Sequence, residues 1–181
     1  MKNLFKKFFL IALVSGLGLG AQAQGFEPGP GFKQANFGVG VGGWGIPIYG
    51  SFDFGISDKI TIGPRIGFTF GYGDDYYYTG SSYNQNRTSF DVSFRGDYHY
   101  GSHIPALPEQ LDLYGGVSLG ASFRRYNYDN NTYFKDYTET DPIVAVQAGA
   151  RWYFTENWGA NAEVSGGYTF TGLTIGLSYM F

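Results

Sequence analysis

The carboxyl end of the chain, Leu173-Thr-Ile-Gly-Leu-Ser-Tyr-Met-Phe181, alternates without interruption between two kinds of side chain. Large apolar residues occupy every second position, and Thr174, Gly176, Ser178 and Met180 lie between them. This period of two indicates a β-strand with one apolar face. An exposed aromatic strand at the edge of a soluble sheet would invite aggregation. The closing strand of a transmembrane β-barrel can instead place this face in lipid and pair its edge with the first strand.

The amino end carries the features of a secretory signal peptide. Lysines precede an apolar run from Phe8 to about Leu19, and Ala21-Gln-Ala23 supplies a cleavage site of small residues. The apolar run is too short to indicate a membrane helix. We therefore expect residues 1–23 to be removed, residues 24–34 to form a periplasmic lead-in, and residues 35–181 to form one domain.

The composition excludes several classes of protein. The chain has no cysteine, a formal net charge of -3, 20% aromatic residues and 29 glycines. The lack of cysteine excludes a disulfide framework and a thiolate metal site. The acidic balance argues against a nucleic-acid partner. Aromatic and glycine enrichment without helical periodicity is typical of many strands joined by tight turns.

The alternation of the last strand recurs along the chain and predicts eight strands in all. They cover residues 35–43, 46–56, 60–71, 88–100, 111–123, 142–154, 158–167 and 173–181. The predicted fold is all-β, an eight-stranded antiparallel up-and-down transmembrane β-barrel. Pro64 cannot donate a backbone hydrogen bond, so we expect a bulge or weakened pairing in the third strand.

The charged residues of these strands all fall on the polar face. They are Asp53, Arg65, Asp91, Arg95, Asp97, Asp112, Arg151 and Glu163. An Arg or Lys facing lipid at mid-bilayer would cost about 2–4 kcal/mol, so the distribution favours a polar lumen over the reversed faces of a soluble barrel. Eight strands leave a lumen that side chains can fill. We interpret the set as a paired structural plug, with a gated small conductance as the alternative.

Aromatic residues gather on the outer face at one end of the predicted strands. They are Tyr98, Tyr100, Trp152, Trp158, Tyr179 and Phe181. Such a set predicts an interfacial girdle, here at the periplasmic rim.

Two long polar segments, residues 72–87 and 124–141, are predicted as loops and are rich in tyrosine. Their tyrosines are Tyr76, Tyr77, Tyr78, Tyr83, Tyr126, Tyr128, Tyr133 and Tyr137. Tyrosine among Ser, Gly and Asn predicts an adaptable surface for an extracellular ligand. Alternatively, these rings extend the aromatic belt or stiffen extensions of the strands. Because outer-membrane barrels have short periplasmic turns, we expect the long loops outside the cell and both termini in the periplasm.

Other motifs lack the context that their chemistry requires. The glycine-rich stretch from Gly38 to Gly43 is followed by Trp-Gly-Ile-Pro and not by the helix of a phosphate-binding loop. His99 and His103 are too few for a histidine metal site. We therefore expect neither enzymatic activity nor a metal or cofactor.

One stretch, Gly149-Ala-Arg-Trp-Tyr-Phe-Thr-Glu-Asn-Trp158, followed by Ala162-Glu163 and the final Gly176–Phe181, resembles a known family. It is similar to the small outer-membrane β-barrel proteins of Gram-negative bacteria, the OmpA-transmembrane, OmpX and opacity-like group. The resemblance implies a monomeric barrel in outer-membrane lipid, with a terminal Phe181 that the barrel-assembly machinery reads. The resemblance gives almost no information about activity. A structural or surface-interaction role, a narrow channel for small solutes, and an adhesin or accessory barrel of a secretion system remain open.

Overall fold

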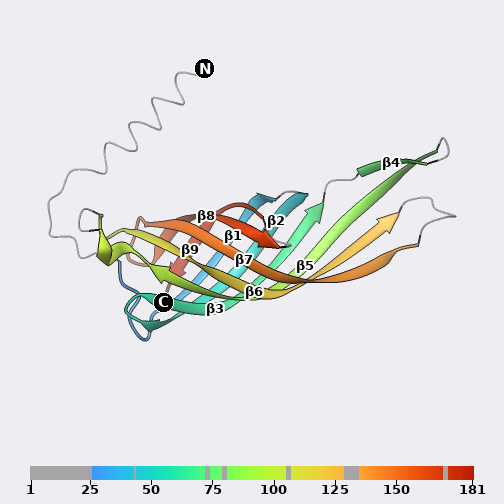
Figure 1. Cartoon of the computed structure of the whole chain (residues 1–181). Coiled ribbons are helices and arrows are strands. Elements are labelled where there is room, and N and C mark those ends of the chain that lie inside the picture. The colour runs from blue at the N-terminus through green and yellow to red at the C-terminus, as the bar shows by residue number, and fades with distance from the viewer. Residues whose placement is uncertain are drawn as a thin grey trace, which may run out of the picture.

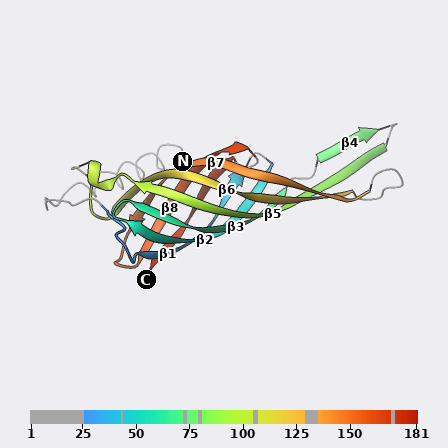
Figure 2. The same ribbon diagram turned by 60° about the horizontal axis from the view of Figure 1, so that its bottom comes forward.

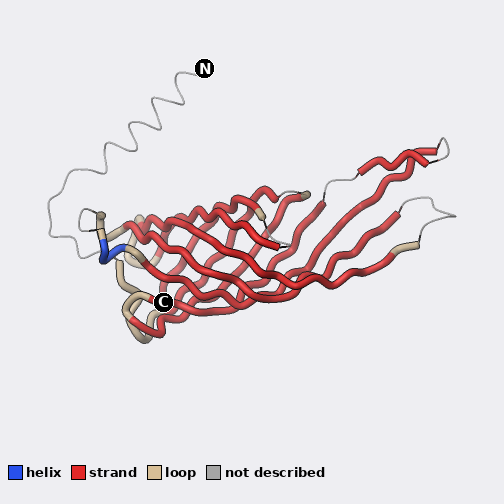
Figure 3. Tube along the Cα trace, viewed as in Figure 1, coloured by secondary structure: helices blue, strands red, loops and turns tan. Residues whose placement is uncertain are grey.

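The computed structural model describes residues 26–42, 44–71, 74–78, 81–104, 107–128, 135–168 and 171–181, without the side chains of 74–78, 81–85 and 102. The predicted signal peptide and residues 24–25 lie outside the described residues. The elements are β1 (Lys33–Gly42), β2 (Gly45–Ser57), β3 (Ile60–Gly71), β4 (Asp74–Tyr78), β5 (Ser81–His99), η1 (Gly101–His103), β6 (Leu111–Tyr128), β7 (Tyr137–Tyr153), β8 (Trp158–Tyr168) and β9 (Gly172–Met180). Strand dominates the described chain (Figure 3).

The strands close into a barrel (Figure 1). The sheet order is β3-β2-β1-β9-β8-β7-β6-β5-β4, and β3 also pairs with β5, so β4 lies outside the closed ring and pairs with β5. Every pairing is antiparallel, and β9 pairs with β1 from Gly172↔Gly42 to Met180↔Gln34. The predicted eight-stranded barrel, closed by its last strand against its first, is confirmed.

The two faces of the barrel wall differ as the alternation requires. Apolar side chains such as Leu119 (59% exposed) and Val146 (63%) point outward, whereas Arg95 and Arg151 are among the largest fully buried side chains. This is the reverse of a soluble domain, where apolar residues fill the interior. No helix in the described part of the chain is both long and apolar enough to cross a membrane.

Three strands extend far beyond the ends that the sequence patterns predict. β5 begins at Ser81 and not at 88, β6 ends at Tyr128 and not at 123, and β7 begins at Tyr137 and not at 142. Much of the two predicted loops is therefore strand, and β4 to β7 project beyond one end of the barrel (Figure 2). The outward apolar face ends with the barrel wall. Backbone pairing continues beyond it, because Tyr and Thr also favour strands there.

Two smaller features concern the beginning of the barrel. β1 starts at Lys33, within the stretch predicted as the lead-in. The ladder between β2 and β3 passes from Phe54↔Ile62 to Ser51↔Arg65 with no pair at Pro64, as the missing N–H of proline predicts.

Candidate functional site

All eight charged residues of the predicted set lie buried inside the barrel. Six strands contribute them: Asp53 from β2, Arg65 from β3, Asp91, Arg95 and Asp97 from β5, Asp112 from β6, Arg151 from β7 and Glu163 from β8. Each side chain turns inward because it alternates with an outward apolar neighbour. The structure joins most of them in two clusters.

The first cluster centres on Glu163. Its carboxylate accepts hydrogen bonds from Arg65 and, at 2.8 Å, from Nη2 of Arg95. Nε of Arg95 donates to Asp97 at 2.7 Å, and the hydroxyl of Tyr114 donates to Glu163 at 3.0 Å. The carboxylate on β8 thus reaches across the lumen and holds two guanidinium groups from the neighbouring strands β3 and β5.

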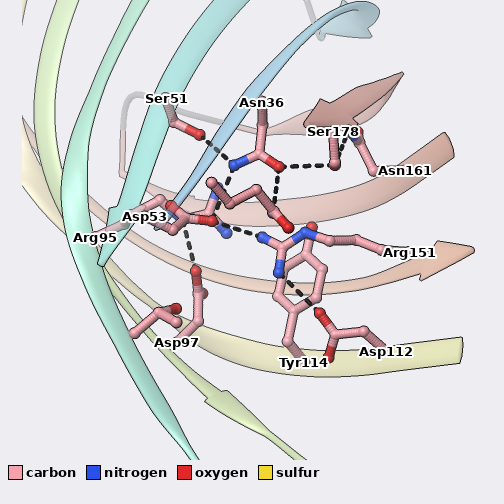
Figure 4. Close-up of polar contacts among 12 residues, drawn as sticks. Asn36, Ser51, Asp53, Arg95, Asp97, Asp112, Tyr114, Arg151, Asn161 and Ser178 are labelled. Atoms are coloured by element: carbon pink, nitrogen blue, oxygen red, sulfur yellow. Dashed lines mark hydrogen bonds and ion pairs between the residues drawn. The ribbon is translucent and has the colours of Figure 1, made fainter. Parts of the chain in front are cut away.

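The second cluster centres on Arg151 (Figure 4). Its Nη1 and Nη2 donate to Asp112 and Asp53, both at 2.9 Å. Asp112 also bonds Nδ1 of His99 at 2.7 Å, and Nε2 of His99 lies 3.0 Å from Oγ1 of Thr61. The ring of Tyr114 lies 4.0 Å from the guanidinium of Arg151 and 5.6 Å from that of Arg95, and so connects the two clusters.

Asp91 lies nearer the projecting end, where Ser89 donates to it at 3.3 Å. Together with Arg65 and Tyr49 it lines a cavity of about 20 Å³. A space of this size holds about one water molecule.

Aromatic groups lie at both ends of the lumen. At the projecting end, the guanidinium of Arg87 lies 5.4 Å from the ring of Trp44 and 5.2 Å from that of Tyr126. At the other end, Phe26 stacks on Tyr153 at 5.2 Å and lies 5.8 Å from His99. Phe26 belongs to the stretch predicted as a lead-in, and this contact places it against the end of the barrel.

The sequence reasoning missed several members of this network. His99, Tyr114 and Tyr153 share the polar face of their strands, and that alternation was the available signal for including them. Trp44 and Phe26 lie outside the predicted strands, so no period could find them. Among the described residues, no group of His, Cys, Asp and Glu could hold a metal ion.

Residues 9–181 match the family model of the outer membrane protein beta-barrel domain. The chain belongs to this family. It is an integral β-barrel of the outer membrane, and its apolar outer face meets membrane lipid.

Solved structures share the fold of this outer-membrane barrel. A major outer membrane protein from Thermus thermophilus has 12% identity and a TM-score of 0.58, covering 83% of this chain and 98% of that one. Neisserial surface protein A has 13% identity and a TM-score of 0.56, covering 83% and 96%. The attachment invasion locus protein Ail of Yersinia pestis has 12% identity and a TM-score of 0.53, covering 84% and 99%. No curated protein matches the chain.

The six residues predicted as a girdle lie at the barrel end that holds Phe26 and the carboxyl terminus. The rings of Trp158 and Tyr179 are 4.9 Å apart, and those of Tyr179 and Phe181 are 5.0 Å apart. Tyr98 and Tyr100 form a separate pair at 5.2 Å. Trp152, at the end of β7, is 41% exposed.

The tyrosines predicted in loops lie mostly on strands of this outer-membrane barrel. Tyr126 and Tyr137 are register partners on β6 and β7, and their rings stack at 4.6 Å with an interplanar angle of 14°. Tyr128 ends β6; Tyr76, Tyr77 and Tyr78 belong to β4 and Tyr83 to β5. Tyr133 lies outside the described residues.

Proposed function

We propose that this outer-membrane barrel has a structural and surface role, that its lumen is closed to solutes by paired charges, and that it is not an enzyme. The observation that carries the proposal is the double engagement of Arg95 and Arg151, each of which pairs with two carboxylates. Removing one partner of a buried pair costs about 3–5 kcal/mol, because an uncompensated charge remains. Opening a solute path through the lumen would require breaking such pairs.

The aromatic groups at the two ends support the same proposal. Trp44 and Arg87 lie at the projecting end of the lumen, and Phe26 lies against Tyr153 and His99 at the other. A solute would have to displace groups at both ends as well as the two charge clusters.

The proposed orientation puts the projecting strands outside the cell and both termini in the periplasm. Its support is the contrast between the ends: two residues join β2 to β3 at one end, while β4 to β7 project at the other. We also propose a monomer, inserted by the barrel-assembly machinery through β9. The pairing of β9 with both β8 and β1 supports a monomer, because the closed ring leaves no free edge on β9 or β1 with which a second copy could pair.

Conductance across a planar bilayer tests the closed lumen. We expect the purified protein to show no steady openings, and Arg95→Ala combined with Arg151→Ala to produce them, because two guanidinium groups leave the lumen. Arg125→Ala is the matched control, since Arg125 is exposed and outside the lumen. Steady openings of the unaltered protein that Arg95→Ala changes would overturn the proposal.

A second candidate function is binding at the cell surface through the projecting strands. Ail of Yersinia pestis, with 10% identity and a TM-score of 0.54, has a structure in complex with the heparin analogue sucrose octasulfate. That likeness shows the fold alone, so the support comes from the strand extension itself. Replacing residues 73–86 and 126–138 by short turns should remove adhesion of expressing cells. Unchanged adhesion would eliminate this candidate.

A further inference from the structure

The barrel wall is shorter on the side of β8, β9, β1 and β2 than on the side of the projecting strands. β8 ends at Tyr168, β9 begins at Gly172, and β1 and β2 meet at Gly42 and Gly45. β5, β6 and β7 continue well past this level (Figure 2). Part of the inner face of these three strands is therefore accessible on the side of the short strands: Tyr137 is 47% exposed, whereas Tyr126 is buried at 7%.

Planar groups line this face in an ordered row. Arg87, Tyr126 and Tyr137 are successive register partners across β5, β6 and β7, so their side chains share one face. Tyr137 stacks on Tyr126, Arg87 lies 5.2 Å from the Tyr126 ring, and Trp44 follows 5.4 Å from Arg87. Because each side chain contacts the next, the row is already ordered before any ligand binds. We call Trp44, Arg87, Arg124, Tyr126 and Tyr137 the aromatic ledge.

The charges beside the ledge balance. Arg124 pairs with Asp141 at 3.3 Å, and Arg124 is also the register partner of Glu139. Two arginines, Arg87 and Arg124, thus face two carboxylates, those of Glu139 and Asp141. These four described side chains offer both donors and acceptors, and their formal charges cancel. A polyanion would require a surplus of basic groups, which the described side chains of this face do not provide.

A flat aromatic face beside paired donors and acceptors fits a neutral sugar. A pyranose has one flat C–H face, which can lie on a tyrosine ring, and a rim of hydroxyls that both donate and accept. An extended peptide fits less well. A peptide would bind by pairing with a free strand edge, but over the ledge both edges of β6 are already paired, with β5 and with β7. On β7, Pro142 lacks a backbone N–H donor close to the first pair with β8, Val144↔Tyr168.

We propose that the aromatic ledge binds a neutral saccharide chain, with one sugar ring on Tyr137 and the hydroxyls of a following ring on Arg124 and Asp141, because Asp141 lies four residues further along β7. This names the ligand class of the surface-binding role proposed above and rests on it. Tyr137 contributes the stacking surface, and the ion pair contributes direction, because its donor and acceptor are fixed relative to the ring.

Calorimetric titration of the purified full barrel in a detergent without sugar groups tests the proposal. The probes are chitohexaose, maltohexaose, mannohexaose and cellohexaose, with sucrose octasulfate as the polyanion. At least one neutral probe should bind with a dissociation constant of about 1 mM or lower. Tyr137→Ala should weaken this binding about tenfold, whereas Tyr137→Phe should keep it within about twofold. Tyr168→Ala is the matched control, because Tyr168 is exposed on β8 at the same end.

The salt dependence of binding distinguishes a neutral sugar from a polyanion. Binding of a neutral sugar should be unchanged between about 50 mM and about 500 mM salt, whereas polyanion binding should weaken strongly. The proposal fails if no neutral probe binds, if sucrose octasulfate alone binds, or if Tyr137→Ala has no effect. If the shortened projecting strands abolish adhesion while no neutral probe binds, the surface role stands and the ligand class is wrong.

Discussion

At the scale of single residues, the lumen depends on shared partners. Glu163 holds Arg65 and Arg95, and Arg151 holds Asp53 and Asp112. Replacing either Glu163 or Arg151 therefore removes one ion-pair partner from two buried groups at once. We expect this network to specify one arrangement of the wall more strictly than an apolar filling would. Breaking it at its centre should cost far more than removing a surface ion pair.

Replacing Arg151 should measure this difference. Arg151→Met leaves the carboxylates of Asp53 and Asp112 buried without the guanidinium, and should lower the free energy of unfolding by about 3–5 kcal/mol. Arg125→Met should cost less than about 1 kcal/mol, because Arg125 is 64% exposed and lies 4.0 Å from Asp136. Denaturant titration in micelles, followed by tryptophan fluorescence, gives both values. Equal stability of the two variants would contradict the role assigned to Arg151.

At the scale of elements, the seam between β1 and β9 permits a close approach of two backbones. Gly38 and Gly176 are register partners on the lumen side. A Cβ at Gly38 would lie 2.2 Å from the carbonyl oxygen of Ile175, and one at Gly176 would lie 2.1 Å from that of Phe37. The glycines therefore set how tightly the last strand closes on the first.

A methyl group at this seam should impair closure. Gly38→Ala should cost about 1–3 kcal/mol through overpacking, and should reduce the heat-modifiable, folded fraction recovered from membranes. Gly50→Ala on the neighbouring strand is the control, because a Cβ there meets its nearest atom, the carbonyl oxygen of Asn36, at 3.9 Å. Equal folded fractions for the two variants would show that the seam tolerates a side chain.

At the scale of the whole molecule, the barrel has two unlike ends. One end carries the projecting strands, and the other carries the carboxyl terminus (Figure 1). The aromatic ledge lies at the first end, and Phe26 and the tight turn between β2 and β3 lie at the second. We propose that the contacting rings of Trp158, Tyr179 and Phe181 anchor the second end, because amphipathic rings suit the boundary between lipid and water. These differences underlie the proposed orientation.

Labelling of single cysteines can establish the orientation, because the chain has no cysteine of its own. With Thr138→Cys in the projecting part of β7 and Glu156→Cys in the turn before β8, a membrane-impermeant maleimide should label only the former on intact cells. Both positions are exposed, so both should react after lysis. Labelling of Glu156→Cys on intact cells, without that of Thr138→Cys, would reverse the orientation.

The sequence by itself determined the class of fold and the side of the wall on which the eight charges of the predicted set lie. Both follow from a local period of two, which needs no knowledge of distant residues. The alternation in Leu173–Phe181 placed the last strand, and the same rule sent Arg95, Arg151 and Glu163 inward before any pairing was known.

Only the tertiary structure decided which charges meet and how far the strands reach. Arg151 pairs with Asp53 across 98 positions of sequence because the tilt and stagger of the closed barrel bring β2 and β7 to one level. No local pattern encodes that stagger. The extensions of β5 to β7 escaped prediction because, beyond the apolar wall of the barrel, pairing of Arg87, Tyr126 and Tyr137 needs no apolar face. Backbone hydrogen bonds between neighbouring strands sustain those extensions, and their partners exist only in the folded barrel.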